Sequence, residues 1–250
     1  MTDPSPILLA KLAHDAGFVV EHGETDGWLA FAAPGRDLKL WLRAQDEALI
    51  AALSRRDVLA EIPFGVAWRG ALPRAAQGAR LVGSTNDLLT LLHRARVLER
   101  TLPNALLDDY RASIVDVDTT EALALVRQRR GQALFRKGLF DYWGGRCAIT
   151  GLDVPELLRA SHAKPWKDAS DAERLDIHNG LLLAAHLDAA YDQGLLTVHL
   201  DGRVELSRRL NQPAKALLGL TALPRVAGLN AAHAPFLTWH VERVFAAAPL

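Results

Sequence analysis

The sequence predicts an α+β protein in two parts, and three observations lead to this fold class. Short strand-like runs are separated by turn residues through most of the N-terminal part. Residues 84–98 have the apolar spacing of an amphipathic helix. Residues 160–194 combine a strand, a polar loop, a second strand and a short helix in one supersecondary unit. A chain of 250 residues has room for one large or two modest domains.

The composition is that of a globular protein. Half of the residues are hydrophobic, which excludes a disordered chain. Lys+Arg and Asp+Glu both total 29, so any DNA-binding face must come from local clustering of charge. The single cysteine, Cys147, excludes an internal disulfide framework and a zinc site that needs two thiolates. We expect its side chain to be a small buried hydrophobe.

The hydropathy pattern gives no sign of export or of a membrane. The first residues, MTDPSP, lack the basic-then-apolar pattern of a signal peptide. No stretch approaches the roughly 18 uncharged apolar residues of a membrane span. We therefore expect a cytoplasmic protein without a membrane partner.

The N-terminal domain is expected to span residues 1–108 and to be α+β by itself. Alternating apolar residues indicate half-buried strands, helical spacing indicates helices, and Gly17 supplies a helix stop. The expected elements are a helix over 7–17, strands over 18–21, 27–31 and 38–42, a helix over 48–53, a strand over 66–68 and a helix over 84–98.

Three tryptophans, Trp28, Trp41 and Trp68, are the notable feature of this domain. Core packing is the more common use of such residues. The alternative is an aromatic pocket for a flipped or modified base. This half contains no catalytic constellation and resembles no family, so recognition of DNA or of a modified base is its hypothetical role.

Residues 101–116 indicate a connector, because they contain Pro103 and the acidic pair 108–109. A second domain, 109–250, follows. Its first helix is expected over 118–143, with a start that has capping-box spacing. The segment 127–146 contains six basic residues and only one acidic residue. The basic residues are candidates for DNA phosphate contacts: Arg127, Arg129, Arg130, Arg136, Lys137 and Arg146. The alternative is a solvated basic helix face.

The segment 160–194 concentrates the residues that can carry chemistry, namely His162, His178, Asn179, His186, Asp188 and Asp192. A strand is expected to end at His162, and a charged loop to cover 164–176. Asn179-Gly180 is predicted to form a tight turn before the apolar run 181–183. A short helix from about 186 to 192 is stopped by Gly194. Strand and helix could then bring residues about 25 apart together.

This segment resembles the HNH nucleases of the ββα-metal fold. The resemblance is closest to a subgroup whose core reads CxxTG, ASH, NGLLL and HxDxxFD. Those pieces stand here as CAITG, ASH, NGLLL and HLDAAYD, at residues 147–151, 160–162, 179–183 and 186–192. A looser likeness extends over about 129–245, and the nuclease core is placed at 145–194. The basic segment also resembles the family's RxGQxxFR lead-in.

The resemblance implies roles for individual residues. His162 would be the general base, and Asn179 would pin the loop that orients it. The wider family's final histidine falls nine residues after that Asn, where this chain has Asp188, whereas His186 stands at the seventh position. The ligand assignment therefore stays open. The favoured metal set is His186 and Asp188, with His186 also catalytic, and Asp192 is either a further metal residue or a helix cap.

Several of these residues also have ordinary structural explanations. His178 is expected to be a loop residue, and Asn179-Gly180 could be only a hairpin turn. After residue 194, a hairpin over 196–206 and a helix over 236–245 are expected to flank the unit. His199 is expected to be exposed, and His233 and His240 to have no catalytic role.

The resulting hypothesis is metal-dependent hydrolysis of DNA phosphodiesters, in restriction of foreign or modified DNA. The cofactor would be a divalent cation, Mg²⁺ first, with Mn²⁺, Ni²⁺ and Zn²⁺ as alternatives. A homodimer would suit double-strand cleavage. A competing hypothesis is a DNA-binding or regulatory module that keeps the HNH scaffold without cleaving, and RNA is an alternative substrate.

Overall fold

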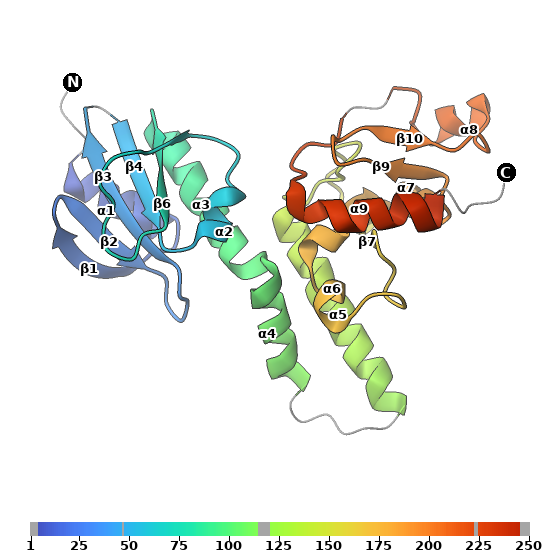
Figure 1. Cartoon of the computed structure of the whole chain (residues 1–250), viewed down its shortest axis with the longest axis horizontal. Coiled ribbons are helices and arrows are strands. Elements are labelled where there is room, and N and C mark those ends of the chain that lie inside the picture. The colour runs from blue at the N-terminus through green and yellow to red at the C-terminus, as the bar shows by residue number, and fades with distance from the viewer. Residues whose placement is uncertain (1–4, 47, 115–120, 223–224, 246–250) are drawn as a thin grey trace. The chain divides into compact units, whose positions relative to one another are not determined.

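The computed structural model describes residues 5–46, 48–114, 121–222 and 225–245, without the side chains of 103–104, 113–114 and 121–127. The chain divides into two compact units, Met1–Glu99 and Arg100–Leu250 (Figure 1). Both helices and strands are present, which confirms the α+β class. Among the described residues, no helix combines the length and apolar character needed to cross a membrane.

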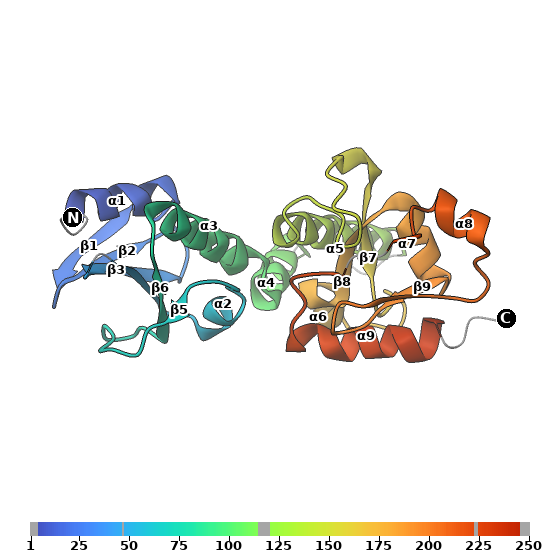
Figure 2. The ribbon, with the colours of Figure 1, turned by 90° about the horizontal axis from the view of Figure 1, so that it is seen from above.

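Unit 1 is built on an antiparallel sheet of six strands in the order β1-β2-β3-β4-β6-β5. Helices α1 and α3 lie on the same side of this sheet (Figure 2), and the Ser84 hydroxyl caps α3 by accepting from the amide of Asp87 (3.1 Å). The element bounds are α1 Pro6–Asp15, β1 Val20–Thr25, β2 Trp28–Ala32, β3 Lys39–Gln45, β4 Ala48–Leu53, α2 Arg56–Ala60, β5 Val66–Ala67, β6 Gly78–Val82 and α3 Thr85–Thr101.

The prediction of a helix over 48–53 is wrong, because Ala48–Leu53 forms strand β4. This strand lies between β3 and β6 and is buried along nearly its whole length. A six-residue apolar run has no periodicity that separates a strand from a helix. Pairing on both sides and burial on both faces override the helical preference of its alanines.

The range 101–116, expected to be a connector or domain boundary, is mostly helical, because α4 occupies Pro103–Ile114. The division between the two units lies just before it, at Glu99/Arg100. Proline is tolerated at the first position of a helix, where its missing N–H costs no hydrogen bond. Helix α4 packs on α5 (Glu121–Tyr142), where Gly138 leaves room for the side chain of Leu106. The expected boundary at 108/109 falls inside α4.

In unit 2 the antiparallel pair β7–β8 lies between α5 and the short helix α7 (Figure 2). A second hairpin, β9–β10, follows (Figure 1). Its core is apolar and includes Cys147, buried as predicted. The remaining bounds are β7 Leu158–His162, α6 Asp171–Arg174, β8 Gly180–Ala184, α7 Ala185–Asp192, β9 Leu196–Val198, β10 Val204–Leu206, α8 Gln212–Leu217 and α9 Ala234–His240, with 3-10 turns at Pro155–Leu157, Ile177–Asn179 and Ala231–His233 and a π-helical turn at Val241–Phe245.

Asn179-Gly180 is not the tight turn that the dipeptide suggested. Asn179 ends a 3-10 turn, and Gly180 begins β8 in an extended conformation (φ −152°). Glycine is needed here for space, because a Cβ would lie 2.5 Å from the Phe135 ring and 2.7 Å from Leu139. The close packing of α5 on the start of β8 explains this glycine.

We expect Gly180→Ala to lower the free energy of unfolding of unit 2 by about 1–3 kcal/mol, because the added methyl overpacks the α5–β8 contact. Urea unfolding followed by far-UV circular dichroism measures the change. Gly83→Ala is the control, since a Cβ there meets no atom within 4 Å. Equal effects of the two substitutions would contradict the steric explanation.

Candidate active site

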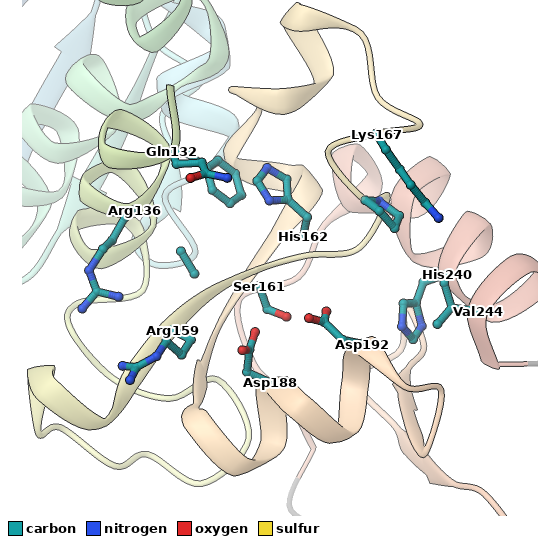
Figure 3. A pocket seen from close by; sticks show the side chains of 13 residues that line it. Gln132, Arg136, Arg159, Ser161, His162, Lys167, Asp188, Asp192, His240 and Val244 are labelled. Atoms are coloured by element: carbon teal, nitrogen blue, oxygen red, sulfur yellow. The ribbon is translucent and has the colours of Figure 1, made fainter. Parts of the chain in front are cut away.

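A cavity of about 570 Å³ opens in unit 2 beside the β7–β8–α7 segment (Figure 3). Side chains from α5, β7, the loop after β7, α7 and the C-terminal helical segment all reach it. The lining residues are Gln132, Phe135, Arg136, Arg159, Ala160, Ser161, His162, Pro165, Lys167, Asp188, Asp192, His240 and Val244. Of the predicted site residues, the cavity brings together His162, Asp188, Asp192 and Arg136.

His162 is the last residue of β7 and is held from two sides. Its ring stacks on Phe135 of α5, with centroids 3.7 Å apart, and its Nε2 lies 3.0 Å from the carbonyl oxygen of Arg174. A carbonyl can only accept, so a neutral ring must carry its proton on Nε2, which leaves Nδ1 as a proton acceptor. Burial lowers the pKa of His162 to about 4, more than the carbonyl contact offsets. The ring is therefore neutral at pH 7.

Asn179 fixes the loop that supplies this carbonyl. Its fully buried amide donates to the carbonyls of Lys164 (3.2 Å) and Glu173 (2.9 Å) and accepts from the Lys164 amide (2.7 Å). The backbone of Asn179 also accepts from Ala163 (2.9 Å). The two ends of the loop are thereby tied to one side chain, next to His162 and Arg174.

The same loop is stiffened by its own polar side chains. Lys164 and Glu173 form an ion pair with Nζ–Oε distances of 2.7 and 2.9 Å. Glu173 also completes a capping box with Ser170 at the start of α6. Arg174 donates to the Trp166 carbonyl (2.8 Å), and its guanidinium lies 5.1 Å from the centroid of that indole. The Arg174 carbonyl that contacts His162 is therefore part of a connected polar network.

Two carboxylates face the cavity from one side of α7. Asp188 and Asp192 are one helical turn apart, and both point toward the Ser161 hydroxyl in Figure 3. Partial desolvation and, secondly, the charge of Asp188 raise the pKa of Asp192 to about 6. Ser161 is 2% exposed, and its Oγ has no hydrogen-bond partner among the described residues. Among the described residues, none forms an ion pair with, or donates a hydrogen bond to, these three side chains.

His186 lies elsewhere on α7. It is exposed and does not line the cavity that Asp188 and Asp192 line. Within the described ranges, no group of three or more His, Cys, Asp or Glu side chains comes together to hold a metal ion. The structure thus separates His186 from the other two members of the metal set expected from the sequence, because residues two apart on a helix point in widely different directions.

The basic residues expected to contact phosphate have varied surroundings. Arg136 lines the cavity, but its guanidinium donates to the carbonyls of Leu158 (2.9 Å) and Pro155 (3.2 Å). Lys137 forms an ion pair with Asp141 (2.9 Å), and Arg146 forms one with Asp153 (3.2 Å). Arg129 and Arg130 are exposed on α5, and the side chain of Arg127 lies outside the described residues.

Sequence reasoning missed several residues of the cavity, namely Gln132, Phe135, Arg159, Ser161, Lys167 and His240. Ser161 stands directly before His162 in the ASH piece, which is a signal that the sequence carried, and Arg159 shares a strand face with Ser161. Lys167 stands in the loop between the two halves of the motif, so its charge could have been counted with the site. No sequence signal distinguishes His240 from other histidines of a C-terminal helix.

The other histidines have structural surroundings. His178 is buried beside Asp176, with Nδ1 2.9 Å from Oδ1, and His233 is buried in contact with the ring of His178. His199 is partly exposed and pairs with Glu205 (2.8 Å). His240 is buried, stacks on Tyr191 at a centroid distance of 3.6 Å, and lies 2.9 Å from the Thr197 hydroxyl.

A comparison with known protein families agrees with this geometry. Residues 147–199 match the family model described as HNH endonuclease. The chain contains an HNH domain. The HNH match includes the β7–β8–α7 segment with His162, Asn179, Asp188 and Asp192. It confirms the resemblance to HNH nucleases over residues 147–199, whereas the subgroup stays a prediction. No curated protein matches the chain at a significant level. An HNH endonuclease domain is a nuclease domain that acts on DNA, and HNH nucleases generally use a divalent metal ion.

We expect Asn179→Ala to lower the free energy of unfolding of unit 2 by about 2–4 kcal/mol, because it leaves buried polar groups of the loop unpaired. Hydrogen exchange should show faster exchange at the amides of Ala163 and Lys164. Asn211→Ala, which removes one exposed cap of α8, is the control and should leave those amides unchanged. Undisturbed protection at Lys164 in the Asn179 variant would contradict the proposed loop anchor.

We expect buried His240 to make the protein acid-sensitive. Burial lowers the pKa of His240 to about 4 from an ordinary value of 6.5, so the unfolded chain binds the proton first and stability is lost as pH falls from 6.5 toward 4. Between about pH 7 and about pH 4.5 this group should remove about 2 kcal/mol. Urea unfolding in EDTA should show a smaller loss in His240→Gln; equal losses in both proteins would contradict the assignment.

Proposed function

We propose that this chain is a metal-dependent endonuclease that hydrolyses DNA phosphodiester bonds in the cavity lined by His162, Asp188 and Asp192. One observation carries the proposal. A neutral histidine, oriented by a backbone carbonyl through Nε2, stands at the end of β7 in a cavity that also contains two carboxylates. Hydrolysis of a phosphodiester needs a base for water and positive charge near the phosphate, and this arrangement provides places for both.

His162 would act through Nδ1. Nδ1 accepts a proton from water, the water oxygen attacks phosphorus, and the bond from phosphorus to the leaving oxygen breaks. The pKa near 4 applies to the free protein. A bound phosphodiester places negative charge near the ring, which favours the imidazolium and raises the pKa toward neutrality. The Arg174 carbonyl accepts from Nε2 throughout and keeps the ring in one orientation.

The residues around Asp192 fit a hard divalent cation. The buried Ser161 hydroxyl without a partner and the carboxylates of Asp188 and Asp192 offer oxygen donors of the kind that Mg²⁺ and Mn²⁺ prefer. Ni²⁺ and Zn²⁺ favour nitrogen or sulfur donors, which this set lacks. Asp188, Asp192 and Ser161 would hold the ion, and when bound it would stabilise negative charge on the phosphate and the leaving oxygen.

The DNA backbone would be held by basic side chains at the rim of the cavity. Arg136, Arg159 and Lys167 line it, and none forms an ion pair with another described residue. Lys137 and Arg146, by contrast, are paired with aspartates. Unpaired cations are the ones that gain most from a phosphate. Restriction of foreign or modified DNA and action as a homodimer are part of this proposal as predictions from the sequence.

A plasmid-nicking assay with Mg²⁺, Mn²⁺ or Ni²⁺, and with EDTA, tests the proposal. We expect metal-dependent cleavage that falls by about 100-fold or more in His162→Ala, because the general base is lost. Asp188→Asn and Asp192→Asn should also reduce cleavage, and the remaining cleavage activity of each variant should increase less with the metal concentration. His93→Ala is the matched control, an exposed histidine of α3 in unit 1.

Two outcomes would overturn parts of the proposal. Absence of cleavage with every metal, from folded protein that still shifts DNA on a gel, would favour the non-cleaving module. Loss of activity in His186→Ala together with full activity in Asp192→Asn would restore the ligand set that includes His186. Full activity in His186→Ala supports the set made of Ser161, Asp188 and Asp192.

A further inference from the structure

The sheet of unit 1 has a second face that carries aromatic and basic side chains. Strand alternation places Ala30, Trp41 and Ala52 in cross-strand register on one face, whereas Phe31, Leu40 and Leu53 share the opposite face. The latter residues are buried in the unit's main core. On the first face, Ala52 belongs to a smaller cluster with Trp28, Ile50 and Ala79, and Trp41 and Trp68 are only partly buried against this cluster.

This face contains a cavity of about 310 Å³. The lining residues are Thr25, Asp26, Trp28, Ala30, Trp41, Arg43, Ala71, Leu72, Pro73 and Arg74. Ala30, the cross-strand partner of Trp41, contributes only a methyl group to the lining. The rim, residues 71–74, is held in place by Trp68, whose Nε1 donates to the Ala71 carbonyl (3.4 Å). Gly70 lies so close to that indole that a Cβ would meet it at 2.3 Å.

Charged groups at this cavity are few and specifically placed. The Arg43 guanidinium lies 5.9 Å from the centroid of Trp28. Neither Arg43 nor the exposed Arg74 forms an ion pair with another residue that the structure describes. Asp26 sits in the β1–β2 turn with φ 53° and supplies one carboxylate. The lining thus includes two aromatic side chains, two cations and one carboxylate.

A second, smaller cavity of about 240 Å³ continues the groove along the sheet. It shares Ala30 and Trp41 with the first cavity and adds His22, Phe31 and Lys39. Trp41 therefore stands between two hollows, with Arg43 and Arg74 on one side and Lys39 on the other. A chain of alternating planar and anionic groups would match this order of aromatic and basic side chains.

We propose that the cavity beside Trp28 and Trp41 binds one unpaired nucleobase of DNA, with the adjoining phosphates at Arg43, Arg74 and Lys39. The base would stack on the indoles, as bases do on aromatic side chains in extrahelical and single-strand sites. Asp26 only accepts hydrogen bonds when ionised, so it favours bases with an exocyclic amino group and disfavours thymine, whose edge is dominated by carbonyl oxygens. The choice of DNA rests on the proposed function.

The test uses the full chain carrying His162→Ala, in EDTA, so that binding is measured without cleavage. Fluorescence anisotropy compares short labelled oligodeoxynucleotides of dC, dA or dT, and a duplex with one unpaired dC against the fully paired duplex. We expect dC and dA to bind more tightly than dT, and the unpaired dC to strengthen duplex binding. Trp41→Ala should weaken single-strand binding about tenfold, the loss of one stacking contact.

Two surface variants keep the test decisive where Trp41→Ala disturbs the sheet. Arg74→Gln should weaken binding of all three oligonucleotides about equally and reduce its salt dependence. Asp26→Asn should reduce the preference against dT, and asparagine tolerates the positive φ of this turn. Arg36→Gln, an exposed residue of unit 1 outside the cavity, is the control and should leave binding unchanged.

The result separates this site from the nuclease proposal. Binding that is absent, or unchanged in Arg74→Gln and Asp26→Asn, overturns the nucleobase site even if the wild-type protein cleaves plasmid DNA. Sensitivity to both substitutions supports the site even if no metal yields cleavage. Equal affinity for dT and dC, with no effect of the unpaired base, overturns the assignment of a base pocket in favour of plain phosphate binding.

Discussion

The side chain of Asn179 is the constraint on which the candidate active site depends. Its buried amide joins the carbonyls of Lys164 and Glu173, and so closes a loop that begins after His162 and ends at Arg174. The Arg174 carbonyl then accepts from His162 and selects the ring's tautomer. A buried amide with no alternative partners holds this geometry more firmly than an exposed one could, because any opening leaves polar groups unpaired in the interior.

The cavity contains a neutral histidine and two carboxylates, which have opposite electrostatic requirements. Burial keeps His162 neutral, as the proposed general base must be before the reaction, whereas two carboxylates on α7 line the same cavity. Desolvation and, secondly, the charge of Asp188 raise the pKa of Asp192 to about 6. A cation and a phosphodiester would meet these demands together, since one neutralises the carboxylates and the other stabilises a charged imidazole.

The sequence predicted the β7–β8–α7 order and the positions of His162 and Asn179, because the motif spacing reflects contacts within one small unit. The predictions were wrong where the conformation of an element depends on contacts with segments that are distant in the sequence. Ala48–Leu53 is a strand because β3 and β6 pair with it, and Pro103 starts α4 because Leu106 packs on α5. Of the predicted cation ligands, Asp188 and Asp192 line the cavity, whereas the rotation of α7 puts His186 outside it. An unpartnered hydroxyl such as that of Ser161 is visible only in three dimensions.

The chain has zero net charge, but its basic residues differ in whether an acidic residue lies beside them. Many basic residues are compensated locally, as in the pairs Lys137–Asp141 and Arg203–Glu205, so they add little to the field that DNA would meet. The basic side chains without such pairs include Arg159 and Lys167 at the HNH cavity and Arg43 and Arg74 at the cavity of unit 1. The net charge of the chain does not distinguish basic residues in ion pairs from those without one. Because phosphate contacts depend on uncompensated local charge, a neutral protein can present separate DNA-binding sites in its two units.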